Sequence, residues 1–163
     1  MIGNFLRVTR TELDDYLKDS TLLENRIYND ETEDKNLVDI EKAWAGIIFL
    51  LTGKDFEEAE DHPLMQIFFS GQLIDEEQDL GYGPAQYLTP EQVAKLNEQI
   101  SGITIADLKQ KFDPEKMTEA DVYPSIWDEG DDAFDYLAEY FKVMQQVYND
   151  ATNNKEAIIT FIN

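Results

Sequence analysis

Acid–base chemistry near neutral pH has one obvious candidate in this chain, His62, which is its only histidine. Glu60 and Asp61 precede it and Pro63 follows, so a carboxylate–histidine base or a metal ligand is one interpretation. A general base also needs an orienting and a reacting partner, and the sequence reveals neither. We therefore favour the other interpretation, in which His62 is a surface residue at the start of a helix.

Nucleophilic chemistry has even less support in the residue types. Cysteine is absent, which excludes a thiol nucleophile, a thiolate metal site and a disulfide framework. Serine remains available in principle, but none of the chain's four serines lies in a nucleophile-elbow motif. These are Ser20, Ser70, Ser101 and Ser125. No catalytic residue is predicted.

The segment from residue 30 to residue 41 resembles a calcium-binding EF-hand loop in part. Asp30, Thr32 and Asp34 alternate as ligands would, and Glu41 stands at the twelfth place. The sixth place, however, is Lys35, where the sharp turn needs glycine and where an ammonium group opposes a cation. The pattern therefore does not predict a metal site.

Two further segments predict no cofactor. Residues 128–135 (DEGDDAFD) could bind divalent cations loosely, but they more simply place negative charge at the positive end of the last helix. Gly81 and Gly83 lack the third glycine and the preceding buried strand of a phosphate-binding loop. We expect no bound cofactor and no metal.

A set of aromatic residues that stand near glycines or prolines, or on the predicted buried helix, is more suggestive of a ligand site. Indole and phenol groups need a polar partner when they are buried, and a convergent set would form a pocket with an apolar floor and a few polar groups. The alternative is that each residue packs in the core or a loop, because aromatic side chains dominate core burial. The candidate pocket residues are Trp44, Tyr82, Gly83, Pro84, Tyr87, Tyr123 and Trp127.

The elements that would position these residues are mostly helical. Alternating apolar residues predict strands in residues 1–9 and 156–163, and we expect these two strands to pair in a small sheet. Residues 39–53 predict a helix that is apolar nearly all round and therefore buried, ending at Gly53. Residues 54–61 (KDFEEAED) are typical of a solvated linker. The fold class predicted is α+β, one compact domain with a small sheet that includes the N- and C-terminal strands.

Capping residues predict where the helices later in the chain begin. Thr89, Pro90 and Gln92 form a capping box with proline at the first helical position. Thr104 with Asp107 begins the next helix by the same pattern. Residues 72–87 carry no helical period and predict an edge strand or an ordered loop, and a long last helix is expected from about residue 131 to residue 151.

Composition limits the classes of partner. The chain of 163 residues has 35 acidic and 13 basic residues, a net charge of −22. Such a surface repels nucleic acid and anionic lipid, so neither nucleic acid nor a membrane is expected as a partner. It favours cations or a basic protein partner, unless it simply reflects an acidic host proteome. With no signal-peptide pattern and no membrane-length apolar run, we expect a cytoplasmic protein.

The combined motifs resemble one known family. The segments MIGNF, DIEKAWAGIIFLLTG, DLGYGPAQYLTPEQV, KFDPEKM and VYPSIW occur in the order and spacing of the YfbM-like bacterial proteins, a domain of unknown function. The resemblance covers nearly the whole chain and implies one YfbM-like domain over residues 1–163, bacterial and without established activity. Residues 29–36 and 54–61 match nothing in that pattern.

Two functional hypotheses follow from these observations. The first is a non-catalytic binding or interaction domain with a strongly acidic surface, which could neutralise a basic protein partner such as a toxin. The alternative is an enzyme or small-ligand receptor with an aromatic-lined pocket near the loop of Gly81 to Pro84.

Overall fold

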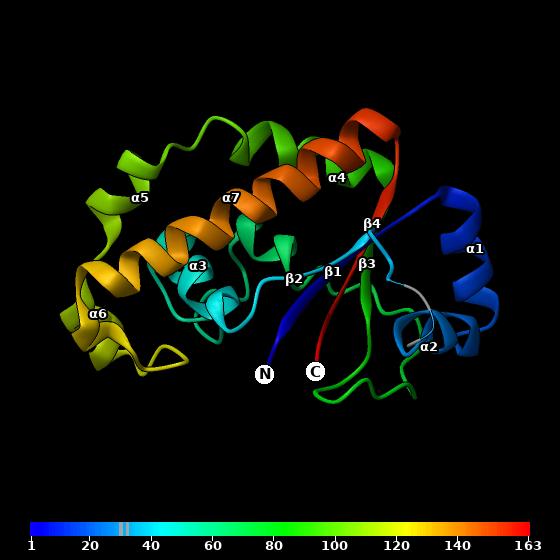
Figure 1. The fold of residues 1–163 in the computed structure, drawn as a ribbon, viewed down its shortest axis with the longest axis horizontal. Coiled ribbons are helices and arrows are strands. Elements are labelled where there is room, and N and C mark those ends of the chain that lie inside the picture. The colour runs from blue at the N-terminus through cyan, green and yellow to red at the C-terminus, as the bar shows by residue number, and fades with distance from the viewer. Residues whose placement is uncertain (30, 32) are drawn as a thin grey trace.

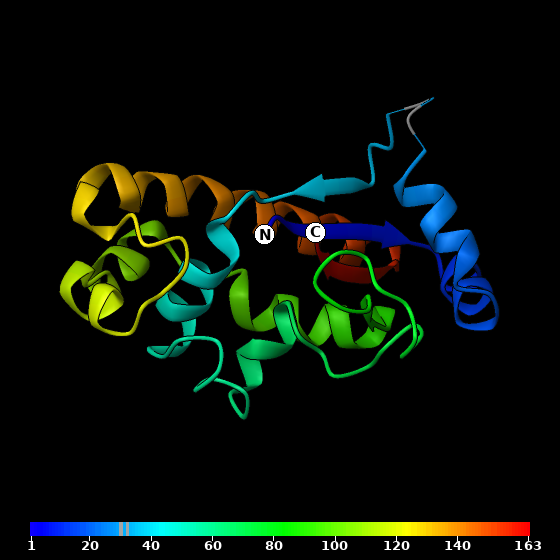
Figure 2. The same cartoon turned by 90° about the horizontal axis from the view of Figure 1, so that it is seen from below.

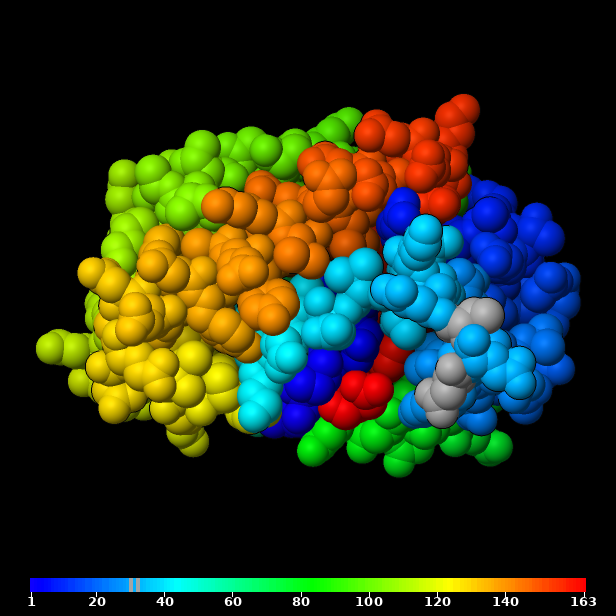
Figure 3. All heavy atoms as spheres, in the orientation of Figure 1, coloured from blue at the N-terminus to red at the C-terminus, as the bar shows by residue number. Residues whose placement is uncertain are grey.

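The sheet at the centre of the molecule is built from the two ends of the chain. The computed structural model describes residues 1–29, 31 and 33–163. Strand β1 (Gly3–Val8) pairs antiparallel with β4 (Ala157–Ile162), in a register that runs from Gly3 opposite Ile162 to Val8 opposite Ala157. The predicted pairing of the terminal strands is confirmed. Both ends of the chain lie beside each other at the surface (Figure 3).

Two short edge strands complete the sheet. Strand β2 (Leu37–Asp39) pairs with β1 and β3 (Gln86–Leu88) pairs with β4, which gives a four-stranded antiparallel order β2-β1-β4-β3 in the described residues. The α+β class is therefore confirmed. The edge strand expected within residues 72–87 proves to be β3, preceded by irregular chain and one isolated bridge from Leu73 to Gln86.

Helices cover one face of the sheet. The helices α3 (Ala43–Thr52), α4 (Pro90–Ile100) and α7 (Asp131–Asn154) pack with Phe5 and Ile158 in the larger of two buried clusters. The short helices α5 (Ile105–Lys111) and α6 (Pro114–Glu119) and the 3-10 turns Pro63–Ile67 and Trp127–Glu129 lie on the same side. Figure 1 shows this group beside α7, the longest helix.

The opposite face carries a smaller core. Helices α1 (Arg10–Lys18) and α2 (Thr21–Ile27) and residues from the 74–85 segment pack on Leu6, Ile159 and Phe161. Because β4 is buried on both faces, its sequence AIITFI is almost continuously apolar rather than alternating. Figure 2 shows β1 near the middle of the molecule, with helices on either side of it.

The buried helix α3 behaves as predicted except at its start. Nine of its ten residues are buried, and it ends at Gly53 in the left-handed conformation with a φ of 76°. It begins at Ala43 and not at Asp39, so that expectation was wrong. Asp39 instead ends β2, and a turn through Glu41 separates the strand from the helix. The pairing of β2 with β1 supplies hydrogen bonds that the local pattern does not reveal.

The capping predictions are confirmed. Thr89 accepts a hydrogen bond from the Gln92 amide, whose side chain bonds back to Thr89 N, and Pro90 occupies the first turn of α4. Thr104 and Asp107 form the same reciprocal box at α5. No helix of the described residues is both long enough and apolar enough to cross a bilayer.

Candidate functional site

A cavity of about 180 Å³ lies beside the N-terminal half of α3. Three stretches far apart in the chain line it: Ala45 of α3, the turn of residues 55–57, and residues 120–123 after α6. The walls comprise two aromatic rings, three carboxylates and small apolar side chains. We call it the first cavity. Its lining residues are Ala45, Asp55, Phe56, Glu57, Ala120, Asp121, Val122 and Tyr123.

The two lining rings, Phe56 and Tyr123, belong to a group of four aromatic rings that continues behind the cavity. The Trp44 ring centroid lies 5.4 Å from that of Phe56, 5.9 Å from that of Phe69 and 6.0 Å from that of Tyr123. Phe56 and Phe69 are themselves stacked at 6.3 Å. These distances are those of favourable edge and offset contacts, so the four residues form one aromatic cluster.

Trp44 is the buried centre of the aromatic cluster. It is 1% exposed, and its indole Nε1 is buried without a hydrogen-bond partner in the described part of the chain. Phe56, by contrast, is 38% exposed. The hydroxyl of Tyr123 lies 3.5 Å from the terminal amino group of Met1. The cluster therefore extends from a sealed indole to an accessible phenyl ring at the cavity.

Three carboxylates accompany the aromatic walls. Asp55 accepts hydrogen bonds at Oδ1 from the backbone amides of Glu57 and Glu58, at 2.8 and 2.9 Å, which holds the turn in place. Asp121 has a positive φ of 50° in the turn that follows α6. Among the described residues, none of Asp55, Glu57 and Asp121 forms an ion pair. The cavity thus presents negative charge that this part of the chain leaves without a counter-charge.

A second, smaller cavity lies beside the glycine-rich loop. It measures about 70 Å³ and is lined in part by Tyr82, Pro84 and Phe69, together with β4 residues such as Thr160 and Ile162. Tyr82 is 63% exposed. Phe69 lines this second cavity and also belongs to the aromatic cluster.

The loop of Gly81 to Pro84 has a structural explanation. Asp79 Oδ1 accepts the backbone amides of Gly81 and Gly83, at 2.9 and 3.2 Å, and these two hydrogen bonds lower the pKa of Asp79. The two glycines have φ values of 127° and 101°, a conformation in which side chains are strained. A Cβ on Gly81 would also lie 3.0 Å from the Cα of Asn163. The glycines are thus needed for a turn packed on the chain's last residue.

Two of the seven predicted pocket residues lie elsewhere. Trp127 is 1% exposed, and its Nε1 donates to the carbonyl of Val122 at 2.7 Å, so its polar group is satisfied inside the core. Tyr87 pairs opposite Ile159 and packs against the smaller core on the far face of the sheet. The structure places Tyr123 at the first cavity, with Trp44 packed against it outside the cavity lining, and it places Tyr82 and Pro84 at the second. Gly83, beside them in the chain, shapes the turn.

The chain is similar to known proteins in both sequence and fold. A family model described as "Domain of unknown function (DUF1877)" matches residues 1–161. The chain belongs to the DUF1877 family. The crystal structure of YfbM, a protein of unknown function from Escherichia coli, is similar with a TM-score of 0.74 and 17% identity, and the match covers 100% of both chains. At that identity the likeness shows the shared fold. No curated protein matches the chain.

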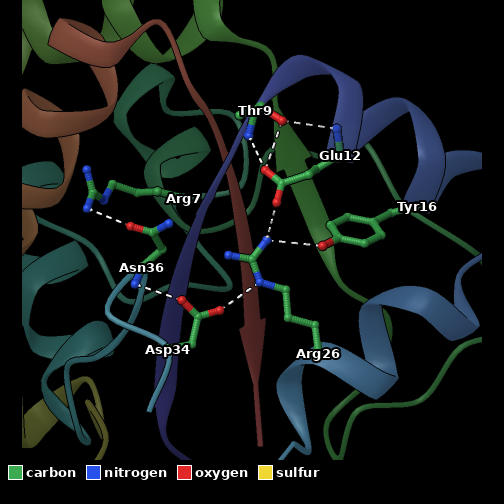
Figure 4. A network of polar contacts seen from close by, with 7 residues as sticks. All are labelled: Arg7, Thr9, Glu12, Tyr16, Arg26, Asp34 and Asn36. Carbon is green, nitrogen blue, oxygen red and sulfur yellow. Dashed lines mark hydrogen bonds and ion pairs between the residues drawn. The ribbon is translucent and has the colours of Figure 1, made fainter. Parts of the chain in front are cut away.

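In this DUF1877 domain the acidic segment before β2 is held by arginine. Arg26 of α2 donates to Asp34 at 2.7 Å, to Glu12 at 3.0 Å and to the Tyr16 hydroxyl at 3.1 Å (Figure 4). Burial opposes ionisation of Asp34, but hydrogen bonds from Arg26 and the Asn36 amide outweigh it and lower the pKa of this carboxyl. The Asp34 carboxylate is therefore engaged by arginine.

Two other positions of the EF-hand-like pattern, Asp30 and Thr32, lie outside the described residues. Arg7 adds a second anchor, because it donates to Asn36 at 2.9 Å and to Glu156 at 3.2 Å. In residues 1–29, 31 and 33–163, no group of three or more histidines and carboxylates is arranged to hold a metal ion.

His62 serves the local backbone of the DUF1877 domain. Its Nδ1 accepts the amide of Leu64 at 3.1 Å, and the residue is the N-cap of the Pro63–Ile67 turn. This is the helix-start role that the sequence favours.

Residues at the first cavity were missed by the sequence analysis. Phe56, Asp55 and Glu57 lie in the segment interpreted as a solvated linker. The one local signal was Phe56 itself, a large apolar residue inside an otherwise acidic run. Its contact with Trp44 spans 12 positions and depends on how the 53–62 turns fold back on α3, which no local pattern reveals.

Proposed function

We propose that this chain is a non-catalytic binding domain that engages a basic protein partner through its acidic surface. The observation that carries the proposal is the net charge of −22 together with the way the few cations are used. All three arginines, Arg7, Arg10 and Arg26, are paired with carboxylates of the same chain. Most of the negative charge is therefore left for an external partner.

The distribution of polar groups supports binding more than catalysis. His62, the only histidine, is engaged by a backbone amide, and cysteine is absent. Histidine is the commonest general acid or base and cysteine a common nucleophile, and each acts when it is held beside an orienting partner. The positive ligand favoured by the charge would be steered toward the protein by long-range attraction, which raises association rates.

The alternative function, an enzyme or small-ligand receptor near the Gly81–Pro84 loop, has weaker support. Ligand sites typically enclose about 300–1,000 Å³. The cavity beside that loop measures about 70 Å³. Tyr82 also lies mostly in solvent, whereas ligand-binding aromatic residues line enclosed sites.

Affinity capture followed by titration tests the proposed function. The protein is immobilised and exposed to lysate of its source cells at about 0.15 M salt, where charges more than about 8 Å apart are largely screened. An unrelated acidic protein of similar size and charge is the control bait. We expect a basic protein that is retained by this chain and not by the control, and that binds stoichiometrically after purification. Retention of the same basic proteins by both baits, or of none, would contradict the proposal.

A further inference from the structure

The first cavity combines three properties that bear on what it could bind. It has a defined volume of about 180 Å³, two aromatic walls, and three carboxylates. Its volume is below the range of about 300–1,000 Å³ that encloses drug-sized ligands, so it is sized for one side chain or a small ion. The question is which side chain these walls would favour.

The walls favour a planar cation. The rings of Phe56 and Tyr123 both line the cavity, and the faces of aromatic rings attract cations through their quadrupole. Asp55, Glu57 and Asp121 add full negative charges that form no ion pair within the described residues. Lys54 is adjacent to Asp55 in the chain but does not line the cavity. No lining residue has a basic side chain, although the Met1 ammonium lies 3.5 Å from the Tyr123 hydroxyl, so the cavity surface itself is aromatic and anionic.

Arginine fits these walls better than lysine or a metal ion. A guanidinium group is planar, weakly hydrated, stacks on aromatic faces and can bond a carboxylate through two N–H groups at once. A lysine ammonium is compact and strongly hydrated, and would lose more on leaving water. A metal ion would need three or more ligands that converge, and no such group occurs in the described residues.

We infer that the first cavity receives an arginine side chain of the basic partner, packed against Phe56 and Tyr123 and paired with the carboxylates at its rim. The inference rests on the proposed function and assigns it a location. Trp44 supports Phe56 and Tyr123 from behind through its ring contacts, and the hydrogen-bonded Asp55 turn holds Phe56 in place. The site is thus assembled before the partner arrives, which reduces the entropy lost on binding.

The chain offers closely matched variants to test the site. Glu57→Gln removes a charge from the cavity, whereas Glu58→Gln removes the same charge from the next residue, which does not line it. Phe56→Leu removes a ring but retains an apolar side chain at a position that is 38% exposed. Tyr82→Leu makes a comparable change at the second cavity, at a position that is 63% exposed.

The first arm of the test uses a single capped residue and needs no partner. N-acetyl-arginine amide is titrated into isotopically labelled protein, and the indole N–H resonance of Trp44 is followed by NMR. The citrulline amide, which keeps the planar shape without the charge, and the lysine amide are the comparison ligands. We expect saturable shifts with arginine, weaker binding with lysine and none with citrulline.

The variants give the expected magnitudes. Phe56→Leu should weaken arginine binding by about 3- to 30-fold, the factor that one cation–π contact is worth. Glu57→Gln should weaken it by about 2- to 5-fold, as for an accessible ion pair. Glu58→Gln should weaken it less than Glu57→Gln does, because Glu58 does not line the cavity, and Tyr82→Leu, at the other cavity, should leave it unchanged. Thermal melting of each variant verifies that the fold is retained.

The second arm uses the captured basic partner and separates the two proposals. If the partner binds the native protein and the Phe56→Leu variant equally, the cavity inference is overturned while the binding function stands. If arginine amide binds at the cavity but no protein partner exists, the inferred chemistry stands and the proposed function fails. Equal binding of arginine and citrulline, or a Trp44 resonance that does not move at millimolar arginine, would overturn the inference directly.

Discussion

The substitution Gly46→Ala sets two opposing effects against each other within α3. Gly46 lies inside this helix, where alanine is normally better by about 1 kcal/mol. A Cβ at Gly46, however, would lie 2.7 Å from Trp127 Cη2 and 2.7 Å from Leu137 Cδ2. Real Cβ atoms essentially never approach so closely, so both neighbours, or the helix itself, would have to move.

Neither neighbour can move easily. Trp127 is 1% exposed and is fixed by its hydrogen bond to Val122, and Leu137 is fully buried. Overpacking of this kind costs about 1–3 kcal/mol, and two immobile neighbours place this site in the upper part of that range. After the helix gain is subtracted, we expect a net loss of about 1–2 kcal/mol.

The assay is thermal or urea unfolding of Gly46→Ala beside a matched control. For a chain of this size, each kcal/mol corresponds to about 2–4 °C in Tm, so the expected fall is about 2–8 °C. Gly102→Ala is the control, because a Cβ there meets no atom within 4 Å. We expect Gly102→Ala to be neutral or slightly stabilising. A Gly46→Ala protein as stable as the native one would refute the packing described around Trp127.

Three further predictions concern polar contacts. Thr89→Ala removes the capping box of α4 and should lower the free energy of unfolding by about 1 kcal/mol, measured by urea unfolding. Tyr148→Phe leaves the buried carbonyl of Ile67 without its 2.8 Å donor and should cost about 1–3 kcal/mol in the same assay; no change would contradict that hydrogen bond. The pKa of Asp34 is lowered in the folded state, so its stabilisation is complete above the ordinary carboxyl pKa and is lost as pH falls through the folded value. Asp34→Asn should therefore reduce the free energy of unfolding at neutral pH and make it fall less steeply as the pH is lowered. If the free energy of unfolding of the variant falls with acid as steeply as that of the native protein, the Arg26 contact is contradicted.

Structural elements that are determined by residues adjacent in the chain could be predicted from the sequence. The Thr89–Gln92 box and the Gly53 helix end are each determined within a few residues, and both are confirmed. Strand β2 was missed because its three residues acquire strand geometry only by pairing with Asn4–Leu6, more than 30 positions away. Because β2 was not predicted, the start of α3 was expected at Asp39 instead of Ala43.

The candidate site was predicted only in part for the same reason. Trp44 and Tyr123 were singled out for their residue type and do meet, at 6.0 Å between ring centroids. Phe56 was overlooked because its acidic neighbours resemble a solvated linker. Trp127 and Tyr87 share the same local signals as Trp44, and only the packing on the two faces of the sheet distinguishes core residues from cavity residues.

The most direct test of the proposed binding function is a calorimetric titration of the purified basic partner at several salt concentrations. Because the partner would be held largely by charge, we predict a saturable complex whose Kd rises steeply with salt. Glu57→Gln should weaken the complex more than its neighbour Glu58→Gln. A complex indifferent to salt, or no saturable binding at all, would contradict the account.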